Sequence, residues 1–380
     1  MSGIIKAYFG AQIHDGYILH DGDALAVDQN GCLSVQPRQA VLLGCQIVEL
    51  DGGLISPGFV DLQINGGGGV MFNNDPSIGT LRIIAQAHAK MGTHALLPTL
   101  ITDTPARTRA AIEAVTQAMD ERVAGIVGIH LEGPHLSVSQ KGAHDAKLIR
   151  PMAKEDLTLI LAATDRMPNV MVTVAPENTT LAQIRTMSAA GVIVSLRHTD
   201  ADAQTYHAAF DAGARCVTHL FNAMSQLGNR EPGLVGATLE RGDVYAGLIA
   251  DGIHVHPSSI RIALAAKQQS EKVYLVTDAV AKAGSEIIEF SLNGREVFRK
   301  DSRLTLADNT LAGADLEMGQ SLRVMTEIVQ DDACNAIARA TSTPASLLRE
   351  NSVAGRFSGT QSQAIFLDAG FKHSALFPEP

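Results

Sequence analysis

The sequence lacks the features of a disulfide-rich, membrane-spanning or nucleic-acid-binding protein. Its four cysteines, Cys32, Cys45, Cys216 and Cys334, are scattered and form no Cys-x-x-Cys pair, which argues against a disulfide framework and against a cysteine zinc site. No apolar run is long enough to span a bilayer. The formal net charge of −10 argues against a general nucleic-acid binder. It leaves open a small anionic substrate, because such a substrate needs only a few local donors.

The first residues also lack a targeting signal. No basic segment followed by an apolar run precedes the first β-like stretch, so we expect no secretory signal and a cytoplasmic location. Hydrophobic residues make up 46% and charged residues 18% of the 380 positions, which is an ordinary globular balance. The chain is therefore long enough for one large domain, or for a large domain with a small one.

The two ends of the chain have β character. Short β-like runs at 13–19, 24–27, 32–35 and 45–50 are separated by Asp-Gly and other glycine-containing turns. Residues 355–368 return to β character and could pair with this first module. We therefore predict a small β-sandwich domain that is built from residues 1–55 together with 345–380.

Between these ends, apolar runs alternate with segments of helical length. Eight runs each end on or close to a polar residue, and they cover 58–65, 93–100, 126–132, 170–177, 191–198, 216–222, 244–251 and 273–278. Helices are expected at 77–91, 105–122, 180–190, 201–212 and 257–268. Continuous apolar strands that alternate with helices indicate an α/β fold with a covered parallel sheet. Eight such units predict a (β/α)₈ barrel over residues 56–344, with its active site at the carboxyl ends of the strands.

A doubly wound open sheet is the competing architecture. It would usually carry a glycine-rich phosphate fingerprint after its first strand, and the glycines at 66–69 lack the GxGxxG spacing. After the eighth run, residues 287–311 resemble hairpin strands with a turn at Asn293-Gly294. Residues 316–329 resemble the last barrel helix, and 333–349 are helical, with a helix start at Ser342-Thr343-Pro344.

The barrel prediction places several polar strand ends on one rim. They are Gln63, Asn65, Glu132, His198, His219, Asp251 and Asp278. One carboxylate with two imidazoles is a known set of catalytic metal ligands, and a carboxylate beside them can serve as general base. Taken alone, Glu132 could instead cap a helix or pair with Lys141 or Arg150, and either histidine could be a hydrogen-bonded strand-end residue. Their joint occurrence on separate strand ends favours a metal site.

These residues lie in stretches that resemble the N-acetylglucosamine-6-phosphate deacetylases of the amidohydrolase superfamily. The matching stretches include Pro57 to Gly66, Leu131-Glu132-Gly133-Pro134, Lys141-Gly142-Ala143-His144, Ser195-Leu196-Arg197-His198-Thr199, Thr218 to Met224, Asn229 to Leu234, Ile249 to Val255 and Leu275 to Ala279. The resemblance covers nearly the whole predicted barrel. It implies hydrolysis of the acetamide of N-acetylglucosamine 6-phosphate to glucosamine 6-phosphate and acetate.

The resemblance also implies a role for each site residue. Glu132, His198 and His219 would bind the metal, and Asp278 would take a proton from the attacking water and later give it to the leaving amine. The other residues would bind the substrate. His144 would hold the amide oxygen, and His254, Asn222 and the Ala223 backbone would hold the sugar phosphate. Arg230 would reach the phosphate in the neighbouring subunit of a homodimer.

The first strand predicts the number of metals. Many amidohydrolases carry His-x-His there and bind two metals, whereas this chain has Gln63-Ile64-Asn65, and amides are poor zinc ligands beside imidazoles. We expect one divalent metal per subunit, with Zn²⁺ as the first expectation and Fe²⁺, Co²⁺ or Mn²⁺ as alternatives.

Three departures from the family pattern stand out. Arg197 replaces the usual glycine and could meet a substrate anion or form a salt bridge below the rim. His135 replaces an apolar residue and is expected to be a surface-loop histidine, and residues 311–315 differ in the substrate loop. Rival functions are deacetylation of N-acetylgalactosamine 6-phosphate or another N-acyl amino sugar phosphate, cyclic-amide hydrolysis or deamination, and a catalytically silent sugar-phosphate sensor.

Overall fold

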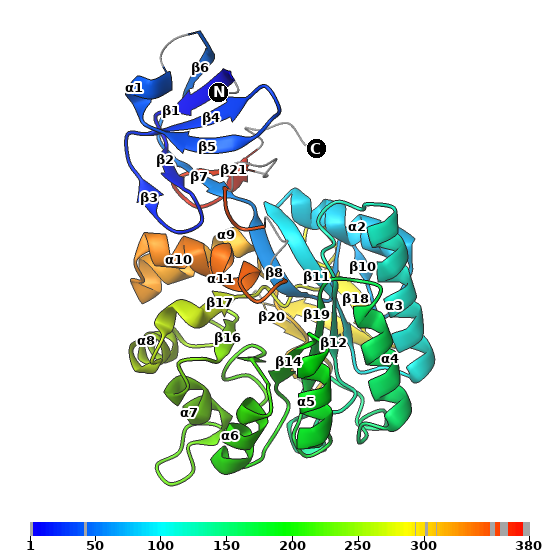
Figure 1. Ribbon diagram of the computed structural model, residues 1–380. Coiled ribbons are helices and arrows are strands. Elements are labelled where there is room, and N and C mark those ends of the chain that lie inside the picture. Colours follow the sequence, from blue (N-terminus) through cyan, green and yellow to red (C-terminus); the bar gives the residue numbers. More distant parts are fainter. Residues whose placement is uncertain are drawn as a thin grey trace.

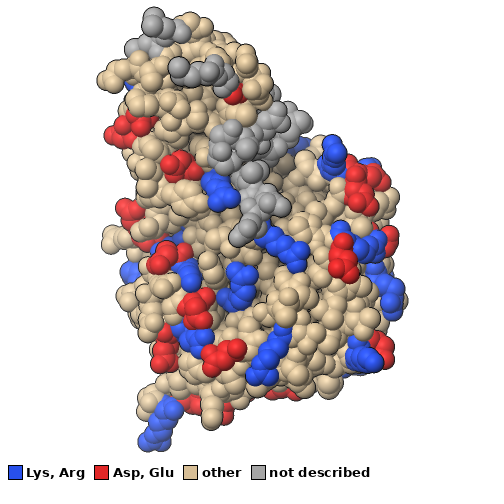
Figure 2. All heavy atoms as spheres, viewed as in Figure 1, with Lys and Arg blue, Asp and Glu red and all other residues tan. Residues whose placement is uncertain are grey.

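The computed structural model describes residues 3–41, 44–292, 294–300, 303–308, 310–349, 354–357 and 364–374. A barrel of parallel strands covered by helices forms most of the molecule, and a smaller part made mainly of β-strands lies beside it (Figure 1). Within the described residues, no helix combines the length and the apolar character needed to cross a membrane. Basic and acidic side chains are interspersed on the face seen in Figure 2.

The predicted (β/α)₈ barrel is confirmed. Its eight strands follow one another in chain order, each parallel to the next. They are β8 (Phe59–Ile64), β11 (Thr93–Ile101), β12 (Ile129–Glu132), β13 (Val170–Val174), β14 (Ile193–Leu196), β15 (Cys216–Val217), β16 (Tyr245–Leu248) and β17 (Val273–Leu275). A parallel bridge between Ile64 and Ala279 joins the last strand to the first. Seven strands lie inside the runs predicted from sequence, and β11 extends one residue beyond its run, to Ile101.

Helices cover the outside of the barrel. They are α2 (Ile78–Ala89), α3 (Pro105–Asp120), α4 (Lys154–Thr164), α5 (Leu181–Ala189), α6 (Ala203–Asp211), α7 (Gly233–Glu240), α8 (Pro257–Ala266), α9 (Met318–Arg323), α10 (Ala333–Ala340) and α11 (Ser342–Ala345). Side chains cap several of them: Ser77, Thr104, Thr180 and Asp202 each accept a hydrogen bond from a first-turn backbone N–H. The helix expected at 316–329 is α9, which continues as the π-helix η3 (Val324–Val329). Short 3₁₀ turns are η1 (Val138–Gln140) and η2 (Ser270–Lys272).

The barrel is filled with side chains rather than hollow. Along β8, Val60 and Leu62 belong to one buried cluster with Tyr274, whereas the neighbouring Phe59 belongs to another buried cluster that includes helix side chains such as Leu81. This alternation follows from the two-residue period of a strand. Because the interior is packed, a ligand site can form only at an end of the barrel.

The smaller part contains two sheets. One has the order β5-β4-β1-β6 and the other β22-β21-β7-β2-β3. The strands are β1 (Ile4–Phe9), β2 (Gln12–His14), β3 (Leu19–His20), β4 (Ala24–Asp28), β5 (Leu33–Gln36), β6 (Gln46–Glu49), β7 (Leu54–Pro57), β21 (Ala364–Leu367) and β22 (His373–Ser374), with the short helix α1 (Arg38–Val41). Because β21 pairs with β7, the expected pairing between the two chain ends is confirmed. The domain boundaries at 55/56 and 344/345 stay a prediction.

Two details of this part differ from the sequence expectation. The run at 13–19 is not one strand, because Asp15 accepts hydrogen bonds from the backbone of Tyr17 and Ile18 and turns the chain between β2 and β3. The strand β1 was not expected from the sequence. A register shift between Ile4 and Lys6 in its pairing with β4 interrupts the regular alternation that would mark it.

A three-stranded antiparallel sheet follows the barrel's last strand. It consists of β18 (Glu289–Leu292), β19 (Arg295–Lys300) and β20 (Arg303–Thr305), as expected for 287–311. The predicted turn residue Asn293 lies outside the described residues. Leu292 packs in one cluster with Met71 and Ile101, and these two residues come from the small hairpin strand β10 (Val70–Met71), paired with β9 (Gly66–Gly67), and from the end of β11. The sheet therefore covers part of the barrel's carboxyl rim.

Candidate metal and active site

The polar ends of the barrel strands surround a pocket of about 240 Å³ at the carboxyl rim. Nine of the residues singled out from sequence line it: Asn65, Glu132, His144, Arg197, His219, Asn222, Ala223, His254 and Asp278. His198 contacts Glu132 at the floor of this pocket. Among the described residues that line the pocket, Arg230 does not occur, and its side chain is exposed.

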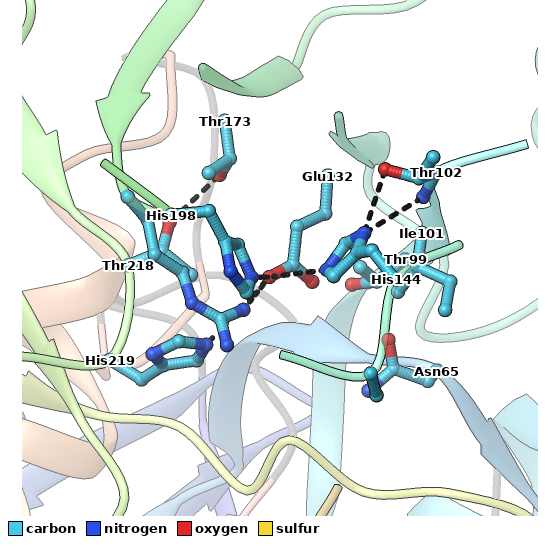
Figure 3. A network of polar contacts seen from close by, with 12 residues as sticks. Asn65, Thr99, Ile101, Thr102, Glu132, His144, Thr173, His198, Thr218 and His219 are labelled. Carbon is cyan, nitrogen blue, oxygen red and sulfur yellow. Dashed lines mark hydrogen bonds and ion pairs between the residues drawn. The ribbon is translucent and has the colours of Figure 1, made fainter. Parts of the chain in front are cut away.

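Three of these side chains leave their strands through an uncommon backbone conformation. The φ angle is 49° at His198, 31° at His219 and 51° at Asp278. Residues other than glycine rarely adopt this left-handed region, which costs about 1–3 kcal/mol for each residue. The chain thus bends sharply two or three residues beyond β14, β15 and β17. Figure 3 shows the result for His198 and His219, which meet beside Glu132.

The ligating atoms of Glu132, His198 and His219 lie close enough to hold one ion. The Oε1 atom of Glu132 is 3.4 Å from Nε2 of His198 and 3.7 Å from Nε2 of His219. All three ligating atoms lie within 4.8 Å of one another, and all three side chains are buried. Within the described residues neither Nε2 atom has a hydrogen-bond partner, and Oε1 of Glu132 forms an ion pair with Arg197.

Hydrogen bonding and burial make the two imidazoles suitable metal ligands. The carbonyl of Gln140 lies 2.5 Å from Nδ1 of His198, so this nitrogen carries the proton and Nε2 keeps a free lone pair. Burial lowers the pKa of His198 and of His219 well below the usual value, and the charge of Arg197 lowers both further. Neutral imidazole and ionised carboxylate are the forms that bind divalent cations. The donor set therefore fits a divalent ion such as Zn²⁺.

Two amides connect Asp278 to this cluster. Gln63 donates from Nε2 to Oε2 of Glu132 (3.2 Å) and to Oδ1 of Asp278 (3.0 Å), and Asn65 donates from Nδ2 to the same Asp278 oxygen (2.7 Å). Both amides thus use their NH₂ groups on carboxylates. Burial raises the pKa of Asp278, although Arg197 and the hydrogen bond from Asn65 lower it. The first strand therefore supplies hydrogen-bond donors at the place where imidazole ligands would hold a second metal.

His144 returns to the cluster from the loop after β12. Its Nδ1 accepts a hydrogen bond from the backbone N–H of Thr102 (3.3 Å) and contacts the Thr102 hydroxyl (2.7 Å). Burial lowers the pKa of His144 to about 3, so the ring is neutral. Its single proton therefore sits on Nε2, which lies 3.8 Å from Oε1 of Glu132. His144 thus presents an N–H donor at the pocket (Figure 3).

The opposite wall carries the residues expected to bind substrate. Nδ1 of His254 lies 2.6 Å from Oδ2 of Asp251, which fixes the ring. Asp251 also accepts hydrogen bonds from the backbone of Ile253 and His254, so it organises its own loop rather than the metal cluster. Asn222 and Ala223 line the pocket in the turn that follows His219.

Arg197 is the cation that faces Glu132. Its guanidinium Nη1 forms an ion pair with Oε1 of Glu132, and its side chain is 11% exposed. Of the two sequence-based alternatives for Arg197, the ion pair is found, but it lies at the rim and not below it. The alternative partners for Glu132 are excluded, because Arg150 pairs with Asp156 and the Lys141 ammonium donates to the Gly142 carbonyl.

The expectation that His135 is a surface-loop residue was wrong. Its side chain is 1% exposed, and Nδ1 lies 3.1 Å from the carbonyl oxygen of Arg150. The backbone N–H of Ala175 also donates to the His135 carbonyl, which ties the loop to the end of β13. The loop after Pro134 therefore folds inward, and His135 supports it from beneath.

Part of the pocket wall was missed from sequence. Met71, Ile101, Leu292 and Thr310 line the pocket beside the polar residues, together with Leu311 of the substrate loop that was noted from sequence. They come from β10, β11 and the sheet that covers the rim. Met71, Ile101 and Leu292 are apolar and Thr310 is uncharged, so these residues give no local signal, and only the folding of that sheet over the rim brings them to the pocket.

The sequence profile of the Amidohydrolase family matches residues 54–356. The chain belongs to this family. An N-acetylgalactosamine-6-phosphate deacetylase of Shewanella sp. (strain ANA-3) is 41% identical over 319 residues, which cover 84% of this chain and 80% of that protein. An N-acetylglucosamine-6-phosphate deacetylase of Haemophilus influenzae is 35% identical over 315 residues, which cover 82% and 81%.

Solved structures of amidohydrolases share the whole architecture. The crystal structure of N-acetylglucosamine-6-phosphate deacetylase from Pasteurella multocida superposes with a TM-score of 0.91 and 32% identity, covering 97% of this chain and 96% of that one. A mutant of the Mycobacterium smegmatis enzyme in complex with N-acetyl-D-glucosamine-6-phosphate gives 0.89 and 28%, covering 98% and 97%. This amidohydrolase is therefore an enzyme, and it shares the barrel and the smaller β-rich part with these deacetylase structures.

Proposed function

We propose that this amidohydrolase removes the acetyl group from N-acetylglucosamine 6-phosphate and releases glucosamine 6-phosphate and acetate. One observation carries the proposal. Two neutral Nε2 atoms face one buried carboxylate oxygen of Glu132, and the second carboxylate, Asp278, lines the same pocket. A divalent metal site with an adjacent proton acceptor can hydrolyse an amide, because the metal polarises the carbonyl and the acceptor takes the proton of the attacking water. The named deacetylase relatives supply the substrate class.

Glu132, His198 and His219 would hold a single divalent ion, for which Zn²⁺ is our first choice. When bound, the ion supplies polarisation of the amide carbonyl and lowers the pKa of water. Gln63 and Asn65 would keep the neighbouring position free of a second ion, since their NH₂ groups already donate to Glu132 and Asp278.

Asp278 would accept the proton of the attacking water and return it to the amine as the C–N bond breaks. The hydrogen bonds it receives from Gln63 and Asn65 end on Oδ1, and no described residue donates to Oδ2. A raised pKa suits this double role, because the carboxyl then holds a proton more readily after accepting it. The Nε2–H group of His144 would hold the amide oxygen during the attack.

The far wall would bind the sugar phosphate. His254, held by Asp251, together with Asn222 and the Ala223 backbone, supplies the donors there. Arg230 is exposed on the loop before α7, and it would reach the phosphate in the neighbouring subunit of a homodimer. The homodimer and the cytoplasmic location remain predictions from sequence.

A second substrate is favoured by one specific observation. The N-acetylgalactosamine-6-phosphate deacetylase of Shewanella shares 41% identity with this chain, whereas the Haemophilus glucosamine enzyme shares 35%. The two sugars differ in the orientation of one hydroxyl group. Discrimination would fall to the part of the pocket wall formed by the sheet that covers the rim, including Thr310 and Leu311.

Acetate release tests both candidates. Protein with stoichiometric Zn²⁺ is given N-acetylglucosamine 6-phosphate, its galactosamine epimer and unphosphorylated N-acetylglucosamine in parallel. We expect rapid release from a phosphorylated sugar and far slower release from the unphosphorylated one. A higher kcat/KM for the galactosamine epimer would establish the second candidate as the substrate. Failure to release acetate from any of the three would refute the deacetylase proposal.

A further inference from the structure

Arg197 occupies the point where the three candidate metal ligands meet. Its Nη1 pairs with Oε1 of Glu132, the oxygen that lies 3.4 Å from His198 Nε2 and 3.7 Å from His219 Nε2. The arginine is tethered there by its position, because it directly precedes His198, and its own backbone N–H donates to the Val174 carbonyl. The positive charge of the Arg197 guanidinium therefore lies within the cluster of candidate metal ligands and not beside it.

The chemistry of the cluster explains why a cation belongs at this point. A carboxylate oxygen and two imidazole lone pairs are all acceptors, and acceptors that face one another in a buried site repel unless a donor or cation lies between them. The guanidinium meets that need, since it is permanently charged and carries only donors. A divalent metal would meet the same need through the same oxygen. Both cations cannot lie against Oε1 together.

We propose that Arg197 neutralises Glu132 when the metal is absent, and that metal binding displaces the guanidinium from this oxygen. The inference rests on the proposed metal site. It makes Arg197 a positioning residue that keeps the ligand cluster assembled without an ion. It also predicts weaker metal binding, because the apparent dissociation constant equals the intrinsic one divided by the fraction of molecules in which Arg197 leaves the site open.

Removal of the guanidinium separates these effects. The variant Arg197→Met keeps most of the side-chain volume but has neither charge nor donors. Arg215→Met is the matched control, because Arg215 directly precedes the neighbouring strand β15 and is exposed at the opposite end of the barrel. Wild type and both variants are stripped with a chelator and titrated with Zn²⁺ against a chromogenic chelator. Thermal unfolding is then recorded with and without Zn²⁺.

We expect Arg197→Met to bind Zn²⁺ at least about tenfold more tightly than wild type, since no arginine must be displaced. Its metal-free form should unfold at a lower temperature than metal-free wild type, because Glu132 is left buried without a cation. The metal-loaded forms should unfold together. Arg215→Met should match wild type in every measurement.

Two results would overturn the inference. One is a Zn²⁺ affinity of Arg197→Met that equals or falls below that of wild type, and the other is equal unfolding temperatures of the two metal-free proteins. If the metal-free variant does not fold, Zn²⁺ release into excess chelator is timed from protein purified with metal, where slower release than wild type is expected and equal release contradicts the inference. Wild type that binds no divalent ion would instead refute the proposed metal site itself.

Discussion

Asp278 offers the sharpest test of the proposed chemistry, through replacement by asparagine. Its Oδ1 accepts hydrogen bonds from Gln63 (3.0 Å) and Asn65 (2.7 Å). An asparagine carbonyl can accept both bonds, so the geometry of the rim should persist. Loss of proton transfer should lower kcat by about 10²- to 10⁴-fold, which corresponds to about 3–5 kcal/mol in the activation barrier.

The same change should leave metal content and stability intact. Burial raises the pKa of Asp278, so folding disfavours its charge, and a neutral amide should not lower the free energy of unfolding. The measurements are kcat for acetate release, zinc per chain by elemental analysis, and the unfolding temperature. If zinc is lost with turnover, Asp278 is chiefly a metal ligand. If kcat stays within tenfold of wild type with zinc bound, another group transfers the proton.

Asp61 provides a matched control with the opposite expected outcome. It is a buried carboxylate on β8, where this first strand meets the segment after β17 and closes the barrel. It accepts hydrogen bonds from the backbone of Gln63 and from the backbone and hydroxyl of Thr277. In Asp61→Asn the new NH₂ group must face one of these donors. This should cost about 1–3 kcal/mol of stability. Turnover should change little, because Asp61 does not line the pocket.

Three further predictions test the site and its surroundings. Glu132→Gln should weaken zinc affinity in a chelator titration by more than the roughly 10- to 100-fold that is typical of losing a group that only supports a ligand. Glu177→Gln is the control and should not weaken it, because Glu177 accepts hydrogen bonds from the Thr199 hydroxyl and the Asp200 backbone instead. Equal losses of affinity in the two variants would remove Glu132 from the ligand set. His144→Asn should lower kcat by about 10²-fold, as expected for losing one donor to the developing oxyanion, with zinc content unchanged; an unchanged kcat would mean that His144 does not hold the amide oxygen. Burial lowers the pKa of His88 to about 4. The stability that comes from keeping this histidine neutral is fully present above pH 6.5, and about 3 kcal/mol of unfolding free energy is lost as the pH falls toward 4. His88→Gln should therefore flatten the fall in unfolding free energy measured by urea denaturation between pH 7 and pH 4, and a curve parallel to that of wild type would contradict this.

The barrel could be predicted because its signal is local. A strand buried on both faces must be apolar along its length, so each run and the polar residue at its end can be recognised without knowing its neighbours. The rim residues followed from one further rule, that parallel strands present their carboxyl ends on the same side. In this way Glu132 and His219, 87 positions apart in the chain, were expected at one place.

The features that were missed depend on contacts between distant segments. His135 looks like a loop residue, and only the inward path of its loop buries it against the Arg150 carbonyl. The apolar wall at Leu292 exists only because the sheet that contains it folds over the rim. The place of Arg197 was left open between two alternatives, since a long side chain can reach either a substrate or a carboxylate from the same Cα. Sequence patterns fix where a strand ends, but they do not fix the direction of a flexible side chain beyond it.

The pairing of β7 with β21 has a consequence for how the chain is made on the ribosome. β7 lies between β2 and β21 in its sheet, and its partner β21 begins at Ala364, more than 300 residues later. During synthesis β7 therefore keeps one open edge while the entire barrel is translated. Open strand edges invite pairing with other chains. The small sheet must stay unfinished or protected until β21 has left the ribosome, so the smaller part is completed after the barrel, although most of its strands are translated first.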